Sequence, residues 1–188
     1  ASSIGKRIDI LGTEADTVAD PNLAGISVIL PPVATNANWS QPGGNAAKSP
    51  GHLMLAEAPQ RAWSAQIAGA SNRMRLAATP VIHDGKLYVI DTDAVVSAFD
   101  AASGSKLWTT ALAVDKDGKP SRFGGGVSTD GTSVFATNGV GDVAALDASN
   151  GAIKWTKRPA GPLRGAPTLS NSNAYVMTQD NQIYAVRM

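Results

Sequence analysis

A motif that occurs twice, with copies 47 residues apart (100 to 147), constrains the fold of this chain more than any other feature. In each copy an aspartate is followed by a glycine four residues later and by a tryptophan eight residues later. The two sets are Asp100, Gly104 and Trp108, and Asp147, Gly151 and Trp155. A period of about 40–50 residues indicates propeller blades, each of which is a sheet of about four strands.

Parts of two further copies flank the complete ones. Trp63 lies 45 residues before Trp108 and looks like the end of an earlier copy. Beyond the second copy, Tyr175 and Ala185 occupy the aromatic and alanine slots of the pattern, but Arg187 stands where the aspartate is expected. The chain therefore contains about three blades' worth of repeats.

Short apolar and β-branched runs, separated by Gly, Asp, Asn or Ser, predict an all-β chain of antiparallel strands. The expected strands are 78–82, 87–91, 95–99, 106–112, 134–137, 143–146, 153–157, 175–178 and 183–186. With one outer strand at Trp63, they predict a partial β-propeller of four-stranded antiparallel blades. An N-terminal arm covers 1–38 and the partial propeller 39–188, with blade repeats that end near Trp63 and span 78–112, 125–157 and 166–188.

The chemistry of the motif explains its residue types. The aspartates end a strand, and their carboxylates can accept backbone N–H bonds from the following turn. Gly104 and Gly151 lie where a hairpin loop of three to five residues needs a positive φ. A tryptophan buries about 150–250 Å², so one tryptophan per blade suits a wedge between adjacent sheets.

Composition excludes several kinds of site. Lys+Arg 16 against Asp+Glu 15 gives a net charge of +1, and no basic cluster points to nucleic acid. There is no cysteine, which excludes disulfides and cysteine nucleophiles. His52 and His83 are the only imidazoles, so a multi-histidine metal centre is not expected. We expect no catalytic residue, metal or cofactor.

Two local patterns have structural interpretations. The pairs Asp91 with Asp93 and Asp115 with Asp117 do not continue into an EF-hand loop, which favours turns over a calcium site. The glycine run 124–126 lacks the Lys-Ser/Thr and the helix of a phosphate loop. Crowding of backbones near the axis of a propeller explains the glycines better.

The repeat Ala-x-Asp-x-x-x-Gly-x-x-x-Trp resembles the PQQ-like propeller repeat, which occurs in quinoprotein alcohol dehydrogenases and in non-catalytic relatives. Further segments resemble the BamB family, the periplasmic lipoproteins of the outer-membrane β-barrel assembly machine. They are residues 30–32, 36–45 and 51–53, which resemble the start of that family, and 161–168. The resemblance covers about residues 28–188. The repeat is specific for the fold rather than for the function, whereas the segments around Trp39 and Leu163-Arg164 point to BamB.

The BamB resemblance implies an eight-bladed propeller with an N-terminal lipid anchor, on the periplasmic face of the outer membrane of a Gram-negative bacterium. It implies a non-catalytic scaffold that binds the POTRA domains of BamA and assists outer-membrane protein assembly. Two departures are the absence of a lipidated cysteine, so that the anchor is not in this chain, and the small number of blades.

Leu163, Arg164 and Gly165 are the candidate partner-binding residues. They follow the expected strand 153–157 and precede the next blade, so they lie on a connection between blades. Such loops protrude at one face, where propellers bind their partners. We expect an exposed Leu163 beside Arg164, because arginine is common among the residues that dominate interfaces.

Two other functions fit the repeat: a fragment of a PQQ-dependent quinoprotein dehydrogenase, and a ligand-sensing or structural propeller. The strand count adds a hypothesis about assembly. The Trp63 piece is an outer strand and the last repeat lacks one, so two chains could close a six-bladed ring as a homodimer, each donating its Trp63 strand.

Overall fold

The computed structural model describes residues 20–69, 78–112 and 125–188. The chain divides into two units, residues 1–31 and 32–188. In the first unit, the 3₁₀ helix η1 (Pro21–Leu23) is capped by Asp20, whose carboxylate accepts the Asn22 N–H at 2.9 Å. Among the described residues, no helix is both long and apolar enough to cross a lipid bilayer.

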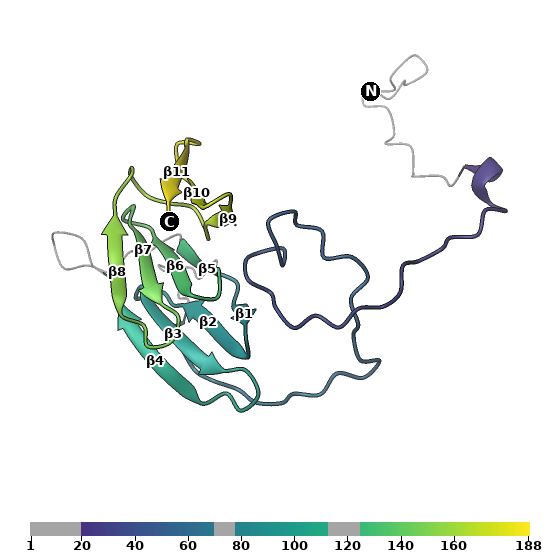
Figure 1. Cartoon of the computed structure of the whole chain (residues 1–188), viewed down its shortest axis with the longest axis horizontal. Helices are drawn as coiled ribbons and strands as arrows, with labels where there is room; N and C mark the ends of the chain where they lie inside the picture. Colours follow the sequence, from purple (N-terminus) through teal and green to yellow (C-terminus); the bar gives the residue numbers. More distant parts are fainter. Residues whose placement is uncertain (1–19, 70–77, 113–124) are drawn as a thin grey trace, which may run out of the picture. The chain divides into compact units, whose positions relative to one another are not determined.

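The second unit contains three antiparallel sheets, which follow one another along the chain (Figure 1). In each sheet, strands that are consecutive in sequence are neighbours. The strands are β1 (Val81–His83), β2 (Lys86–Ile90), β3 (Val95–Asp100) and β4 (Lys106–Ala111); β5 (Gly125–Thr129), β6 (Ser133–Asn138), β7 (Val143–Asp147) and β8 (Ile153–Lys157); and β9 (Thr168–Ser170), β10 (Asn173–Met177) and β11 (Ile183–Arg187).

This architecture confirms the expected all-β fold with four-stranded antiparallel blades. One expected strand is wrong: residues 59–69, around Trp63, form no strand. A strand needs a neighbour for its backbone N–H and C=O groups, and none of the described strands pairs with this segment. The expected arm, 1–38, lies partly outside the described residues, because nothing is described before Asp20.

The register repeats from sheet to sheet. Tyr88 pairs with Ala98, and Ala98 pairs with Trp108, so the three side chains share one face of the first sheet. The same positions in the second sheet are Phe135, Ala145 and Trp155. In the third sheet Tyr175 pairs with Ala185, and none of the described residues adds a fourth strand.

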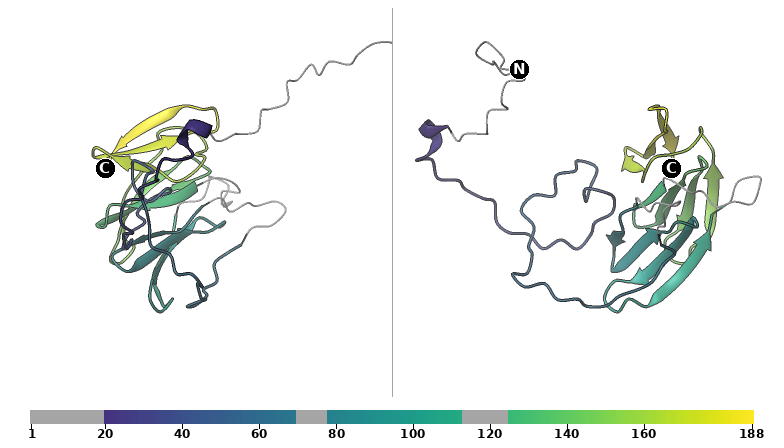
Figure 2. Two further views of the ribbon diagram at one scale, coloured as in Figure 1. Left: turned by 90° about the vertical axis from the view of Figure 1, so that its right-hand side faces the viewer. Right: turned by 180° about the vertical axis from the view of Figure 1, so that it is seen from behind.

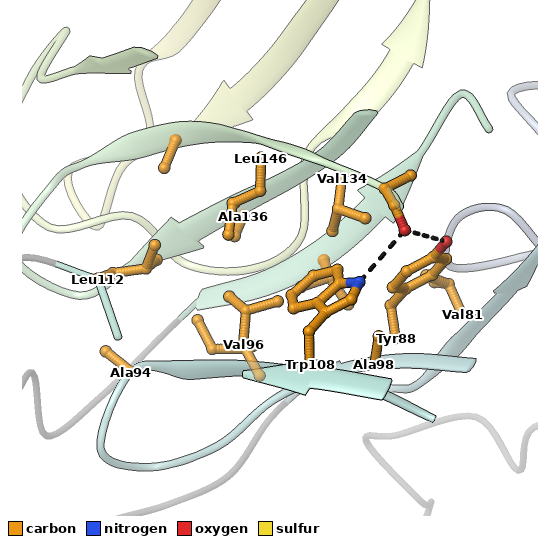
Figure 3. Close-up of a cluster of buried hydrophobic side chains, with 14 residues drawn as sticks. Val81, Tyr88, Ala94, Val96, Ala98, Trp108, Leu112, Val134, Ala136 and Leu146 are labelled. Carbon is orange, nitrogen blue, oxygen red and sulfur yellow. Dashed lines mark hydrogen bonds between the residues drawn. The ribbon is translucent and has the colours of Figure 1, made fainter. Parts of the chain in front are cut away.

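The core lies between the sheets. Figure 3 shows the cluster between the first two sheets, where Tyr88 and Trp108 have ring centroids 5.9 Å apart. Leu146 and Val134 come to the same cluster from the second sheet. Phe135 and Trp155 repeat this arrangement toward the third sheet, with centroids 6.0 Å apart.

Burial shows which sheets are covered on both faces. Every residue of β5 and β6 is buried, because the second sheet lies between the other two. In β10 and β11 of the third sheet, buried residues are interspersed with partly or fully exposed ones. Figure 2 shows the three sheets side by side in chain order from two further directions. The third sheet therefore has one open face.

Candidate functional site

The candidate site is the loop of residues 158–167, which leads from β8 at the end of the second sheet to β9 at the start of the third. The loop pairs with the turn that follows β10. Leu163 forms an antiparallel bridge with Thr178, and the Arg164 N–H donates to the Met177 carbonyl at 2.9 Å. The position of this loop between two sheets is the one expected from the sequence.

Leu163 is fully buried, so the expectation of an exposed leucine is wrong. Its side chain packs with Val143 of the second sheet and with Val176 and Val186 of the third. The side chain leaves water because the loop crosses directly over the junction of two apolar faces. Leu163 therefore anchors the loop, and its neighbours face the solvent.

Arg164 is exposed, and its Nη2 donates to the Gln179 carbonyl at 3.2 Å. Gly165 has open space where a Cβ would stand, and its carbonyl accepts the Thr137 hydroxyl at 2.6 Å. Beside both lies a hollow of about 350 Å³, which Tyr175 and Ile183 of the third sheet also line. The loop therefore presents one guanidinium at the rim of an apolar hollow.

An ion pair that no sequence pattern indicates holds the beginning of the loop. Arg158 donates from Nε to Asp142 Oδ1 at 2.6 Å and from Nη2 to Oδ2 at 2.9 Å. The Asp142 side chain is only 5% exposed, and Asn138 Nδ2 also donates to it, at 3.2 Å. The hydrogen bonding of Arg158 to Asp142 and the negative charge of Asp142 raise the pKa of the Arg158 guanidinium above its usual value.

Close approach to the second sheet holds the end of the loop. A Cβ at Gly126 would lie 2.6 Å from the backbone nitrogen of Ala166, so only glycine leaves room for this contact. Nearby, the Ser128 hydroxyl donates to the Pro167 carbonyl at 2.6 Å. Crowding thus explains the described glycines of the run, and Gly124 lies outside the described residues.

The repeat residues lie in the turns and junctions of the sheets. Asp100 Oδ1 accepts the N–H groups of Ala102 and Ser103, and hydrogen bonds from Ser103 hold the pKa of this carboxyl below its usual value. Asp147 accepts from Ser149 in the same way, and its pKa is lowered likewise.

Each tryptophan of the motif lies against the following sheet. Trp108 Nε1 donates to the Ala148 carbonyl at 3.3 Å, and Trp63 Nε1 donates to the Ala101 carbonyl at 2.9 Å (Figure 3 shows the first bond). Ala101 and Ala148 occupy the same position of the repeat, one residue after the aspartate. Trp63 thus lies in the tryptophan slot of the repeat without belonging to a strand.

The described residues contain no group of three or more His, Asp or Glu side chains that could hold a metal ion. Asp91 Oδ1 accepts the N–H groups of Asp93 and Val95, both at 2.9 Å, which is a turn interaction. Asp115 and Asp117 lie outside the described residues. His83 Nδ1 lies 2.8 Å from the Ser40 hydroxyl.

Comparison with known proteins identifies the repeat. A family model described as outer membrane protein assembly factor BamB matches residues 92–187. The chain is 29% identical to BamB of Escherichia coli over 115 residues, which is 59% of this chain and 29% of the relative. It is 27% identical to BamB of Shewanella oneidensis over 136 residues, 68% of this chain and 34% of the relative. The chain therefore spans about a third or less of the length of these relatives.

A solved structure shares the fold. The quinohemoprotein alcohol dehydrogenase of Comamonas testosteroni matches with a TM-score of 0.63 and 23% identity, over 82% of this chain and 26% of the enzyme. At this identity the match shows the arrangement of the sheets and nothing about activity.

Proposed function

This chain belongs to the BamB family of propeller-repeat proteins, and from that membership we propose that it is a non-catalytic scaffold for outer-membrane protein assembly. In this proposal it binds the POTRA domains of a BamA-type protein at the periplasmic face of the outer membrane of a Gram-negative bacterium. In the full-length form, a lipid anchor tethers the protein to that membrane. No chemical step is involved.

The observation that carries the proposal is an exposed arginine on a loop that is fixed at both ends. The Arg158–Asp142 pair holds the beginning of the loop, and the hydrogen bond from Ser128 to Pro167 holds its end. The buried Leu163 anchors the loop immediately beside Arg164. A guanidinium has five donors in a planar fork and is well suited to carboxylates on a partner. A loop that is already ordered loses little entropy on binding, so more of the contact energy contributes to affinity.

Binding of purified POTRA domains to the whole chain tests the proposal. We expect Arg164→Ala to weaken binding about 10-fold or more, which corresponds to about 1.4 kcal/mol. Arg61→Ala is the matched control, because Arg61 is also exposed and lies far from the loop in sequence. No binding by the unchanged chain, or equal losses in the two variants, contradicts the proposal.

A fragment of a quinoprotein dehydrogenase is the second candidate, favoured by the fold of the Comamonas enzyme. Such an enzyme needs carboxylate and amide ligands for calcium, and the described residues offer no cluster of three acids or histidines for this purpose. Titration with the quinone and calcium separates the two functions: saturable binding of the quinone favours the enzyme, and no binding favours the scaffold.

We also propose that a second copy of this chain covers the open face of the third sheet and closes a six-bladed ring. The expected donation of a Trp63 strand is not part of this proposal, because Trp63 belongs to no strand and bonds to Ala101 of its own chain. Exposure at one position of the repeat supports this. Ala98 and Ala145 are buried under the following sheet, whereas Ala185, at the same position of the third sheet, is exposed. Its neighbour on the same strand, Ile183, is 68% exposed. Among the described residues, no strand pairs with the outer edge of β11, so this edge could accept a strand from another chain.

A further inference from the structure

A short segment before the first sheet bonds to the first strand of each of the three sheets. These strands, β1, β5 and β9, are called the inner strands. Trp39 exchanges two backbone hydrogen bonds with Ile82 of β1, of 2.7 and 2.9 Å. The next residue, Ser40, accepts the Thr129 N–H of β5 at 2.8 Å. These bonds join the segment to the first and second sheets.

Gln41 reaches the third sheet with its side chain. Its Oε1 accepts the Leu169 N–H at 2.9 Å, and its Nε2 donates to the Leu169 carbonyl at 3.3 Å. Gln41 is only 6% exposed. Three consecutive residues therefore bind three consecutive sheets. Neighbouring Cα atoms are only about 3.8 Å apart, so this is possible only where the inner strands converge.

Further contacts fix the segment in this conformation. The Ser40 hydroxyl lies 2.8 Å from His83 Nδ1, and Asn38 Oδ1 accepts the Asp84 N–H at 3.0 Å. A tight turn closes immediately after Gln41, because the Gly44 N–H donates to the Gln41 carbonyl at 2.8 Å. A side chain at Gly44 would meet the Trp39 ring, so the turn and the ring pack together.

The Gln41 amide bonds to the free edge of β9 in the way that an adjacent strand would. Leu169 pairs with Ala174 of β10, but its own N–H and C=O point to Gln41, which is the pattern of a non-hydrogen-bonded pair. Leu169 is buried, so without Gln41 both backbone groups would have no partner in a place that excludes water. One primary amide matches both groups, as an adjacent strand would.

We propose that residues 38–44 form a clip that locks the inner strands of the three sheets together, and that Gln41 positions the Arg164 loop by holding Leu169. Leu169 lies five residues after Arg164, in the strand β9 to which the loop leads. The clip bonds to the β9 edge of the third sheet, which is the edge opposite to β11, where a fourth strand would pair. The positioning role rests on the proposed function, whereas the clip itself does not.

Substitution Gln41→Glu in the whole chain tests the clip. The carboxylate keeps an acceptor for the Leu169 N–H but turns a second oxygen toward the Leu169 carbonyl, which loses its donor. Burial raises the pKa of such a carboxyl, and its protonated form can donate again. We expect the hydrogen-exchange protection factor of the Leu169 amide to fall about 10-fold or more at pH 7 and to recover at pH 4–5.

Gln60→Glu is the matched control, because Gln60 is exposed and belongs to the same N-terminal stretch. The protection of Val96 in the first sheet should change less than about 2-fold in both variants. Unchanged protection of Leu169, or an equal loss at Val96 that acid does not reverse, overturns the clip. If the Gln41→Glu chain does not fold at pH 7, folding on acidification supports the clip, and failure at both pH values overturns it.

Binding of purified POTRA domains by the same variants tests the positioning role. We expect Gln41→Glu to bind at least about 5-fold more weakly than Gln60→Glu at pH 7, although Gln41 is buried and cannot touch a partner. Loss of Leu169 protection with undiminished binding overturns the positioning role. If the unchanged chain does not bind POTRA domains, the proposed function fails, and the exchange result still decides the clip.

Discussion

The indole ring of Trp108 rests on the backbone of Gly151, the glycine of the following repeat. A Cβ on Gly151 would lie 2.7 Å from Trp108 Cδ2, well inside van der Waals contact. The relationship recurs one repeat earlier, where a Cβ on Gly104 would lie 2.7 Å from Trp63 Cδ2. Glycine is therefore required at this position for two reasons. It leaves room for the tryptophan ring, and it adopts a positive φ, which is 77° at Gly151 and 74° at Gly104.

Gly151→Ala should be strongly destabilising. The new methyl group meets the Trp108 ring, and alanine is strained at the positive φ. Together the two effects cost about 2–4 kcal/mol. Denaturant unfolding of the whole chain measures the change. Gly161→Ala is the control, because a Cβ there meets nothing within 4 Å, and its cost should stay below about 0.5 kcal/mol. Equal costs would contradict the packing argument.

Arg158→Leu should destabilise the junction between the second and third sheets. The substitution leaves the buried Asp142 carboxylate without its charged partner, although Asn138 still donates to it. The Arg158 side chain is 46% exposed, so solvent screens part of the pair, and we expect a measurable but partial loss of the free energy of unfolding.

Urea unfolding measures the effect of Arg158→Leu, and Arg158→Leu combined with Asp142→Leu completes the comparison. The double variant removes the unpaired charge and should be less destabilised than Arg158→Leu alone. A double variant that is worse than the single one would show that the network contributes through packing rather than through charge.

The stability of the fold should fall as the pH is lowered into the acid range. Hydrogen bonds from Ser103 and Ser149 lower the pKa values of Asp100 and Asp147 in the folded chain. A lowered folded pKa means that the stabilisation is present above the unfolded value, about 3.9, and is lost as pH falls through the folded value.

The urea midpoint as a function of pH measures this effect. Asp147→Ala should flatten the decline between pH 5 and pH 2, because this turn then no longer has a carboxylate to protonate. Glu57→Ala, at an exposed position, should leave the slope unchanged. A decline that Asp147→Ala does not alter would assign the acid sensitivity to other groups.

If two chains close a ring, light scattering should give a mass of about twice 19.2 kDa. Ala185→Glu should shift the mass to that of the monomer, because it places a charge on the face that the second copy would cover. Gln182→Glu, in the preceding exposed turn, should remain dimeric. A monomer for the unchanged chain contradicts the ring.

The sequence predicted the sheets because their signals are local. Alternating runs, turn residues and the repeated motif involve residues close to one another along the chain, so β2 to β4 and β6 to β8 lie where they were expected. The strand expected at Trp63 is wrong. The spacing of the repeat predicts where the tryptophan packs, but a strand also needs a neighbouring strand with which to pair.

The candidate site was predicted only in part. Arg164 lies on the expected connection, but the pattern could not tell which side of the loop faces the core, and Leu163 proved to be buried. The Arg158–Asp142 pair has no sequence signature, because an arginine and an aspartate 16 residues apart are an ordinary occurrence.

The amino-acid sequence by itself determined the kind of sheet, the order of the strands and the tryptophan at each junction, because each follows from spacing within one repeat. Only the tertiary structure decided what joins the repeats. Gln41 and Leu169 are 128 residues apart, and their contact exists because three inner strands converge on one short segment. Such a meeting depends on the relative placement of whole sheets, and no local pattern of residues encodes it.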